Sequence, residues 1–563
     1  MRRFSCGLAV IGAGLLASLA CAPAAPVSGP AQAPAPSAAA PAPAAPQASQ
    51  APQPKRGGVT VHLRRAAGPN LHPLQGGGAD QRGTVGPAYE SLLTYQLFED
   101  RDLEADFEVI PWLAAAWDQP DPTTYLFRLA KGVRWHDGVE FTAADVVFSY
   151  QYLSDKANSF SKGATIRKDM ATIEALDPQT VRVTTRQASP YFLRSVADDD
   201  VVIVPKHVAE AGGDFAKTVV GTGPFKMKSA DLKKENVFER FEGYWQPGRP
   251  YMEGVRLVYG PDDSAMEAAL VAGKADSLTY QRRAQLDAIL GIYPKARYQA
   301  QAPTYGNVLY PNLERPPFND IRVRKALHLG LDRQAMQKQL TAGQGVINPP
   351  GVPATKKGWA IPAEELANLP GYRQPKAEDL AEAKRLLAEA GYAGGLKTTV
   401  IYPTTVSTPS IAEAFAGQMR TIGVDMELKV LPVPEFRELE TRGGYDVIFD
   451  LTYDMDESGK VHSYYHSKGA LNKIGLKDAK VDAALDTVLS SMDAAERKKA
   501  LLDFQYALLA GYYVIPTIEH ATYQLYQPWY YSPDGVTSLG YYLDTKTATR
   551  AWIDTDLLPA DRR

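Results

Sequence analysis

The sequence predicts an α/β fold, because short alternating strands and capped helices follow one another along the chain without a fixed repeat. Of the 563 residues, 45% are hydrophobic and 22% are charged. This balance is typical of a globular protein that buries a sizeable core. At roughly 100–200 residues per domain, the length predicts several structural units.

Three strands are expected early in the chain. Residues 59–63, Val-Thr-Val-His-Leu, alternate as a half-buried strand does, and residues 125–129, Tyr-Leu-Phe-Arg-Leu, do the same. Residues 133–135 form a third short candidate, followed by the turn sequence His136-Asp137-Gly138. The Asp-Gly pair favours a hairpin over a metal-binding role for His136 and Asp137.

Helices are expected where capping residues precede an apolar stripe. Thr142 and Asp145 have the capping-box spacing, and Asp320 is placed to cap a second helix. A third helix follows Pro375 and ends at Gly391, a residue suited to the left-handed position after a helix. A long fourth helix is predicted over residues 479–509.

Charge and cysteine content exclude several functions. Lys and Arg number 61 against 64 Asp and Glu, a net charge of −3, so there is no basic excess for binding nucleic acid. Both cysteines, Cys6 and Cys21, lie near the N-terminus. The folded part therefore lacks disulfides, thiolate metal sites and a cysteine nucleophile.

The first 20 residues have the pattern of a secretory signal peptide. Arg2 and Arg3 precede an uncharged, mostly apolar run that ends in small residues before Cys21. Residues 18–21, Ser-Leu-Ala-Cys, resemble the bacterial lipobox, which implies lipidation of Cys21; ordinary cleavage with release is the alternative. Residues 21–56, rich in Ala and Pro, are expected to form a disordered, extended tether.

Six stretches after residue 57 resemble one family, the extracytoplasmic solute-binding proteins of ATP-binding-cassette importers, family 5 (the oligopeptide, dipeptide and nickel class). They begin at Tyr89 (Tyr-Glu-Ser-Leu-Leu), Pro111 (Pro-Trp-Leu-Ala-Ala-Ala-Trp), Tyr125 (Tyr-Leu-Phe-Arg-Leu-Ala-Lys-Gly-Val-Arg-Trp-His-Asp-Gly), Gly221 (Gly-Thr-Gly-Pro-Phe), Arg315 (Arg-Pro-Pro-Phe-Asn-Asp) and Leu386 (Leu-Leu-Ala-Glu-Ala-Gly-Tyr). They occur in the family's order.

The resemblance implies a two-lobed periplasmic-binding-protein-like fold of type II, in the large class with an extra subdomain on the first lobe. Lobe I is expected at residues 57–302, with the subdomain at about 92–204, and lobe II at 303–514. Residues 515–563 would return to lobe I. Two crossings between the lobes would then act as a hinge.

The resemblance also places a ligand-binding strand and an acidic anchor in one segment. The strand is Leu451-Thr452-Tyr453, and Asp454 or Asp456 would hold the α-amino group of a peptide through a charge-assisted bond. The family's frequent Trp is Thr452 here, and its usual Asp-Pro is missing. The opposite wall would include Gln75-Gly76-Gly77, and Tyr305 would add an aromatic surface.

Two metal interpretations compete at this segment. Residues 454–459 match the opening of a calcium loop, but position twelve is Tyr465 rather than the bidentate Glu. His462 and His466 are spaced to share a helix face, as ligands of transition metals often are. The alternative for the pair is a solvated or capping role.

The resemblance implies a receptor that captures a peptide or peptide-like solute between two lobes and delivers it to the membrane permease of an ATP-binding-cassette importer. It would work at the extracytoplasmic face of a bacterial membrane, as a lipid-anchored monomer without a cofactor. A nickel or metallophore receptor of the same fold is the first alternative. A secreted hydrolase is the second, although the sequence has no Gly-x-Ser-x-Gly, His-Glu-x-x-His or Gly-Lys-Ser/Thr motif.

Overall fold

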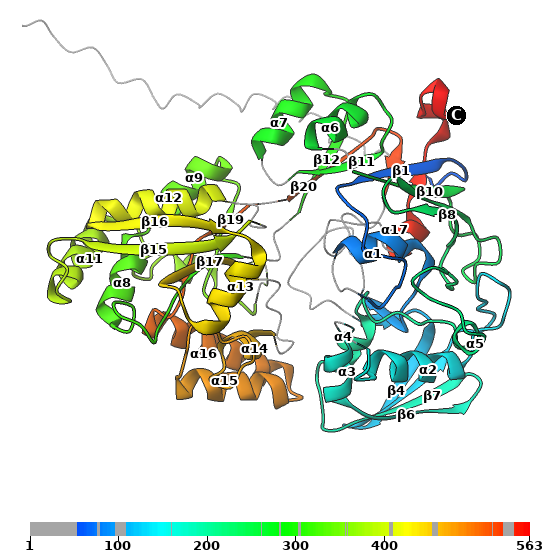
Figure 1. The fold of residues 1–563 in the computed structure, drawn as a ribbon, viewed down its shortest axis with the longest axis horizontal. Coiled ribbons are helices and arrows are strands. Elements are labelled where there is room, and N and C mark those ends of the chain that lie inside the picture. Colours follow the sequence, from blue (N-terminus) through cyan, green and yellow to red (C-terminus); the bar gives the residue numbers. More distant parts are fainter. Residues whose placement is uncertain are drawn as a thin grey trace, which may run out of the picture. The chain divides into compact units, whose positions relative to one another are not determined.

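A computed structural model divides the chain into residues 1–53 and residues 54–563. The described residues are 53–75, 79–95, 109–158, 160, 162–260, 262–280, 283–301, 306–354, 356, 358–404, 409–452, 460–520, 522–532 and 545–563. Their strands form three main sheets (Figure 1). The predicted signal peptide, Cys21 and residues 21–52 of the predicted tether lie outside the described residues. Residues 53–56 of the tether are described, and there Lys55 pairs with Asp554 and Asp556.

The first main sheet has seven strands and combines both ends of the chain. In spatial order these are β12 (Arg297–Gln301), β20 (Thr522–Tyr526), β11 (Ser277–Tyr280), β1 (Val59–Arg64), β10 (Gly254–Tyr259), β9 (Glu235–Arg240) and β8 (Phe225–Asp231). The predicted strand at 59–63 is confirmed as β1, which runs parallel to both of its neighbours. Helices α6 (Asp263–Val271) and α7 (Arg283–Ile292) contribute Leu270 and Leu286 to a small core with β11 and β20.

The second main sheet has five strands from the later part of the chain. Its order is β16 (Val424–Leu431), β15 (Leu396–Pro403), β17 (Val447–Thr452), β13 (Gly306–Pro311) and β18 (Ile515–Pro516). Four helices share its core: α8 (Ile321–Gly330), α9 (Arg333–Thr341), α11 (Ala377–Glu389) and α12 (Pro409–Met419). Figure 1 shows these helices beside β15 and β16.

The helix-cap predictions in this region are confirmed. The Asp320 carboxylate accepts a hydrogen bond from the Arg322 N–H at the start of α8. Gly391 follows α11 with φ +95°, the left-handed conformation that glycine adopts without strain.

A four-stranded antiparallel sheet lies within the predicted subdomain range. Its order is β4 (Ala114–Asp121), β5 (Thr124–Leu129), β7 (Thr180–Thr185) and β6 (Met170–Asp177), with helices α2 (Ala143–Ser154), α3 (Gly163–Asp169), α4 (Phe192–Ala197) and α5 (Lys206–Glu210) nearby. The predicted strand at 125–129 is confirmed as β5. The capping box of α2 is also present, with both Thr142 and Asp145 making their expected bonds.

Two local predictions are wrong. Residues 133–135 do not form a strand, because only Arg134 pairs there, in an isolated bridge to Glu140 across the His136–Gly138 turn. The helix expected over 479–509 is two helices, α15 (Ala479–Ser490) and α16 (Ala494–Gly511). They separate because Asp493 caps α16 through the Ala495 N–H.

Shorter elements connect these layers. They are α1 (Ala79–Val85), β2 (Leu93–Tyr95), β3 (Val109–Pro111), β14 (Val346–Ile347), α10 (Ala363–Leu366), α13 (Val433–Arg442), α14 (Lys460–Tyr465), β19 (Ile518–Glu519), β21 (Tyr530–Tyr531), α17 (Thr545–Arg550) and β22 (Trp552–Ile553), with 3₁₀ turns at Gly86–Ala88, Arg420–Ile422, Thr555–Leu557 and Ala560–Arg562. Among them, β14 pairs with β19, and α14 packs against α15.

The Gly221-Thr-Gly motif allows a close approach of two backbones. The Gly223 N–H donates to the Ala88 carbonyl at 2.9 Å. A Cβ added to Gly221 would overlap that same carbonyl oxygen. The glycines of this motif therefore have a structural role, as the sequence predicts.

Candidate functional site

The predicted ligand-binding strand lies at the end of β17. It pairs antiparallel with β13, so that Leu451 faces Asn307 and Thr452 faces Gly306. On its other side, the described pairing with β15 covers only Val447 and Ile448. The pairing stops close to Pro403, the last residue of β15, which has no N–H to donate.

The buried ammonium group of Lys473 contacts β17. The Lys473 ammonium lies 2.9 Å from Asp450 on β17 and 3.2 Å from Glu440 on α13. It also lies 4.5 Å from the ring centre of Tyr310 on β13, and its side chain is only 6% exposed. The Lys473 ammonium thus connects β17 to α13 and β13. These residues are far apart in the sequence, and no local pattern predicts the cluster.

The predicted opposite wall is described only at Gln75. Its side-chain oxygen accepts a hydrogen bond from Asn70 at 2.9 Å, and its backbone N–H donates to the His72 carbonyl. Among the described residues, no hydrogen bond or ion pair joins Gln75 to β17. The other residues predicted for the ligand site or the calcium loop lie outside the described residues: Gly76, Gly77, Tyr305, Tyr453, Asp454, Asp456 and Ser458. Their roles stay predictions.

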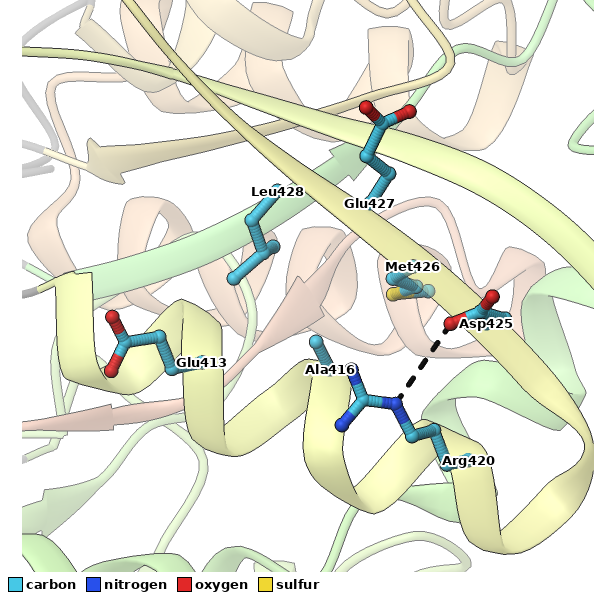
Figure 2. Close-up of a pocket in the computed structure, with 7 residues that line it drawn as sticks. All are labelled: Glu413, Ala416, Arg420, Asp425, Met426, Glu427 and Leu428. Atoms are coloured by element: carbon cyan, nitrogen blue, oxygen red, sulfur yellow. Dashed lines mark ion pairs between the residues drawn. The ribbon is translucent and has the colours of Figure 1, made fainter.

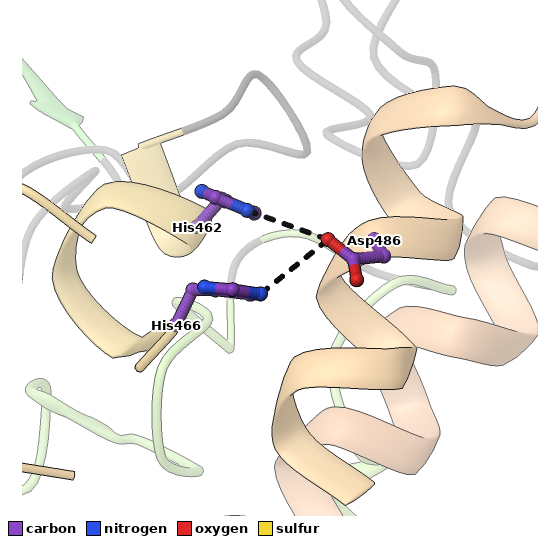
Figure 3. Close-up of side chains that lie close together, drawn as sticks. All are labelled: His462, His466 and Asp486. Atoms are coloured by element: carbon purple, nitrogen blue, oxygen red, sulfur yellow. Dashed lines mark ion pairs between the residues drawn. The ribbon is translucent and has the colours of Figure 1, made fainter. Parts of the chain in front are cut away.

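His462 and His466 lie close together, next to a carboxylate (Figure 3). His462 is in α14, His466 directly follows it, and Asp486 lies on α15. The imidazole rings stack with centroids 4.2 Å apart. Burial, followed by the nearby charge of His466, lowers the pKa of His462, which favours its neutral form.

His136 has a structural role, as the hairpin prediction implies. Its Nδ1 accepts the Gly221 N–H at 3.2 Å, and its Nε2 donates to the Gly223 carbonyl at 2.9 Å. Burial lowers its pKa to about 4. The neighbouring Asp137 instead contacts His207 at 2.7 Å. Because both nitrogens of His136 are in use, it offers no free metal ligand.

Glu90 is a buried carboxyl group for which the sequence has no local signal. It accepts hydrogen bonds from Trp112, Tyr244 and Trp245 at 2.8–3.3 Å. Burial outweighs these bonds and raises the pKa of Glu90 to about 7. It holds three aromatic side chains together and is buried.

Tyr191 connects the region of the four-stranded sheet to the helices after β17. The Tyr191 hydroxyl, next to α4, donates to the Val488 carbonyl in the last turn of α15 at 2.6 Å. That carbonyl is one of those left without a partner inside its own helix. Arg497 of α16 approaches the face of the same Tyr191 ring.

A surface hollow of about 580 Å³ lies between α12 and β16. Figure 2 shows the side chains that line it. Its lining is Glu413, Ala416, Arg420, Asp425, Met426, Glu427 and Leu428. Because β16 is the edge strand and β15 separates it from β17, this hollow is distinct from the predicted ligand strand. Across the part of the chain that the structure describes, no helix has the length and apolarity needed to cross a membrane.

The chain is similar to curated binding proteins along much of its length. It is 25% identical over 481 residues to the periplasmic oligopeptide-binding protein OppA of Escherichia coli K12, covering 78% of this chain and 84% of OppA. It is 27% identical over 328 residues to the glutathione-binding protein GsiB of E. coli O1:K1, covering 57% of this chain. The match covers 61% of GsiB, which is less than two thirds of that relative.

A solved structure has the same fold. The ABC transporter-associated periplasmic binding protein DppA of Helicobacter pylori, in complex with the peptide STSA, superposes with a TM-score of 0.71 at 23% identity, covering 89% of this chain and 98% of DppA. The two-lobed α/β fold expected from the sequence is thereby confirmed.

The family model for the bacterial extracellular solute-binding proteins, family 5 middle region, matches residues 108–472. This range includes the four-stranded sheet, most of the second sheet and the predicted ligand strand. The chain belongs to family 5 of the bacterial extracellular solute-binding proteins.

Proposed function

We propose that this protein captures a peptide or peptide-like solute between its two lobes and delivers it to the membrane permease of an ATP-binding-cassette importer. The main support for this proposal is the strand pairing of β17. In the described residues, β13 pairs with β17 as far as Thr452, whereas β15 pairs only as far as Ile448. An extended peptide added beside residues 449–452 would not have to displace β15.

The names of the relatives support the same solute class. OppA is named as an oligopeptide-binding protein and GsiB as a glutathione-binding protein, and the DppA structure contains a tetrapeptide. In this chain, Leu451, Thr452 and Tyr453 would pair with the peptide backbone. Asp454 or Asp456 would hold the terminal ammonium, and Tyr305 and residues 75–77 would complete the walls.

The reaction is binding and release, without covalent chemistry. A dissociation constant near 1 μM corresponds to about −8 kcal/mol, which allows the solute to leave when the lobes open. The bound peptide should therefore be recovered unchanged. Recovery of cleaved peptide would instead support the secreted-hydrolase alternative.

Calorimetric titration with trialanine and N-acetyl-trialanine tests the ammonium anchor on the mature chain. We expect trialanine to bind and acetylation to weaken binding at least tenfold, because acetylation removes the positive charge. Asp454→Asn or Asp456→Asn should weaken the binding of trialanine and reduce the difference between the two peptides. Asp425→Asn, at the distant hollow, is the matched control. Equal binding of the two peptides would contradict the anchor.

The N-terminal segment would place this receptor at the membrane surface. We propose that residues 1–20 are removed, that Cys21 carries lipid, and that residues 21–56 act as a spacer for a monomeric body. Cys21→Ala should move the protein from the membrane fraction to the soluble fraction, as checked by immunoblotting. Unchanged fractionation would contradict lipidation and leave the receptor proposal in place.

A further inference from the structure

Two imidazoles and one carboxylate converge where α14 meets α15 (Figure 3). The Oδ1 atom of Asp486 lies 3.6 Å from Nε2 of His462 and 3.4 Å from Nε2 of His466. The three ligand atoms all lie within 4.8 Å of one another. Since all three side chains come from adjacent helical segments, the cluster needs no contribution from the predicted solute site.

These spacings fit the edge of a four-coordinate metal site. Zinc binds imidazole nitrogen and carboxylate oxygen at about 2.0–2.2 Å, so two ligand atoms of a tetrahedron lie about 3.3–3.5 Å apart. Adjacent ligands of an octahedron at the same bond length would lie only about 3.0 Å apart. The two distances from Asp486 to the imidazoles are close to those of a tetrahedral site. The stacked rings would turn so that both nitrogens point at one ion, and imidazole favours zinc over calcium or magnesium.

We propose that His462, His466 and Asp486 bind one divalent transition-metal ion of the zinc type, with the fourth position taken by water. The ion would join α14 to α15 and so fix the segment that follows β17. This proposal does not rest on the identity of the solute. It differs from the nickel-receptor alternative because the metal would be a resident ion rather than the transported cargo.

Charged side chains of both signs lie near the three proposed ligands. Asp482 lies 3.8 Å from His466, but its carboxylate already accepts hydrogen bonds from the backbone and hydroxyl of Ser467. It therefore adds negative charge near the site without serving as a ligand. The ammonium of Lys168 adds one positive charge near His462, beside the two carboxylates of Asp482 and Asp486.

Metal binding should also change one backbone hydrogen bond. Without a metal, the Lys468 N–H donates to Nδ1 of His466 at 3.0 Å, which places the proton of the neutral ring on Nε2. A metal on Nε2 takes that position, so the ring proton moves through solvent to Nδ1. There it faces the Lys468 N–H, and two donors cannot share a bond. The hydrogen bond from the Lys468 N–H must therefore break when the metal binds, and this loss can be measured.

The test uses the mature chain, stripped with a chelator and titrated with zinc chloride in a calorimeter. We expect one zinc per chain, with a dissociation constant of about 1 μM or tighter. Asp486→Ala should weaken binding at least tenfold, and because this side chain is 66% exposed, the variant should fold normally. His462→Ala should have a similar effect.

His207→Ala is the matched control, because His207 also contacts a carboxylate, Asp137, but belongs to no described three-ligand cluster. It should leave zinc affinity unchanged. Hydrogen exchange at the Lys468 amide should become at least tenfold faster on zinc addition in the parent and stay unchanged in Asp486→Ala.

No zinc binding up to 1 mM, or equal binding by the parent and the Asp486 and His462 variants, would overturn the proposal. Zinc binding with an unchanged Lys468 amide would also overturn it as stated. Trialanine binding by Asp486→Ala serves as a separate readout. Trialanine binding tests only the proposed receptor function, and zinc binding tests only the metal site. The two proposals can therefore fail independently.

Discussion

Asp276 connects the C-terminus to the first sheet, and its removal should have a large effect on stability. Its carboxylate is fully buried and accepts two hydrogen bonds from Arg562, at 2.7 and 2.8 Å. It also accepts the Trp529 indole N–H at 2.6 Å and the Val61 backbone N–H at 2.7 Å. One side chain thus holds together the first strand, the residues after β20 and the last turn of the chain.

We expect Asp276→Ala to reduce the free energy of unfolding by about 4 kcal/mol. Removing one partner of a buried ion pair costs about 3–5 kcal/mol, because the remaining charge is uncompensated. Leaving the Trp529 and Val61 donors without an acceptor adds about 1 kcal/mol or more for each. Arg562 keeps its bonds to the carbonyls of Gly273 and Val59, which offsets part of this loss.

Urea unfolding followed by tryptophan fluorescence measures this change, since Trp529 is itself part of the cluster. Asp263→Ala is the matched control: the Arg65–Asp263 pair is largely exposed and should contribute less than about 1 kcal/mol. In Asp276→Ala/Arg562→Leu, the combined loss should be smaller than the sum of the single losses. A loss below about 1 kcal/mol for Asp276→Ala would refute the reasoning.

Three further changes test other parts of the structure. Glu90 is neutral in the folded protein below its raised pKa of about 7, so its contribution to stability is complete below about pH 4.5 and is lost as the pH rises through 7. Between pH 5 and pH 8, urea unfolding should therefore show the parent losing up to about 3 kcal/mol more than Glu90→Gln, and parallel pH profiles would contradict this. Gly221→Ala should lower the melting temperature by several degrees, because the added Cβ overlaps a backbone carbonyl. Gly417→Ala, in open space on a helix, should slightly raise it, and similar shifts for both variants would count against the close approach. Tyr191→Phe removes the hydrogen bond from the Tyr191 hydroxyl to the Val488 carbonyl, which is worth about 1 kcal/mol. We expect this contact to favour the peptide-bound form, so the variant should bind peptide about fivefold more weakly by calorimetry. Unchanged affinity would contradict this role.

Local signals in the sequence predicted much of the fold. The caps at Thr142 and Asp320 and the alternation at Val59 act over a few residues, so they can be read directly from the chain. The break between α15 and α16 was missed because Ser491 and Met492 do not strongly interrupt a helical pattern, whereas the Asp493 cap decides it.

The sites depend on contacts that have no local signal. The spacing of His462 and His466 predicted a shared face, but Asp486 joins them only when α15 packs against α14. Lys473 likewise meets its carboxylate partners only after folding. A sequence pattern could therefore suggest part of a site, while tertiary packing determined the rest.

The proposed function requires that two lobes close around a solute. Small-angle X-ray scattering of the mature chain, with and without saturating trialanine, tests it most directly. We predict that the radius of gyration falls when the peptide binds and returns to its starting value when the peptide is dialysed away. An identical scattering profile at full peptide occupancy would contradict closure of the lobes.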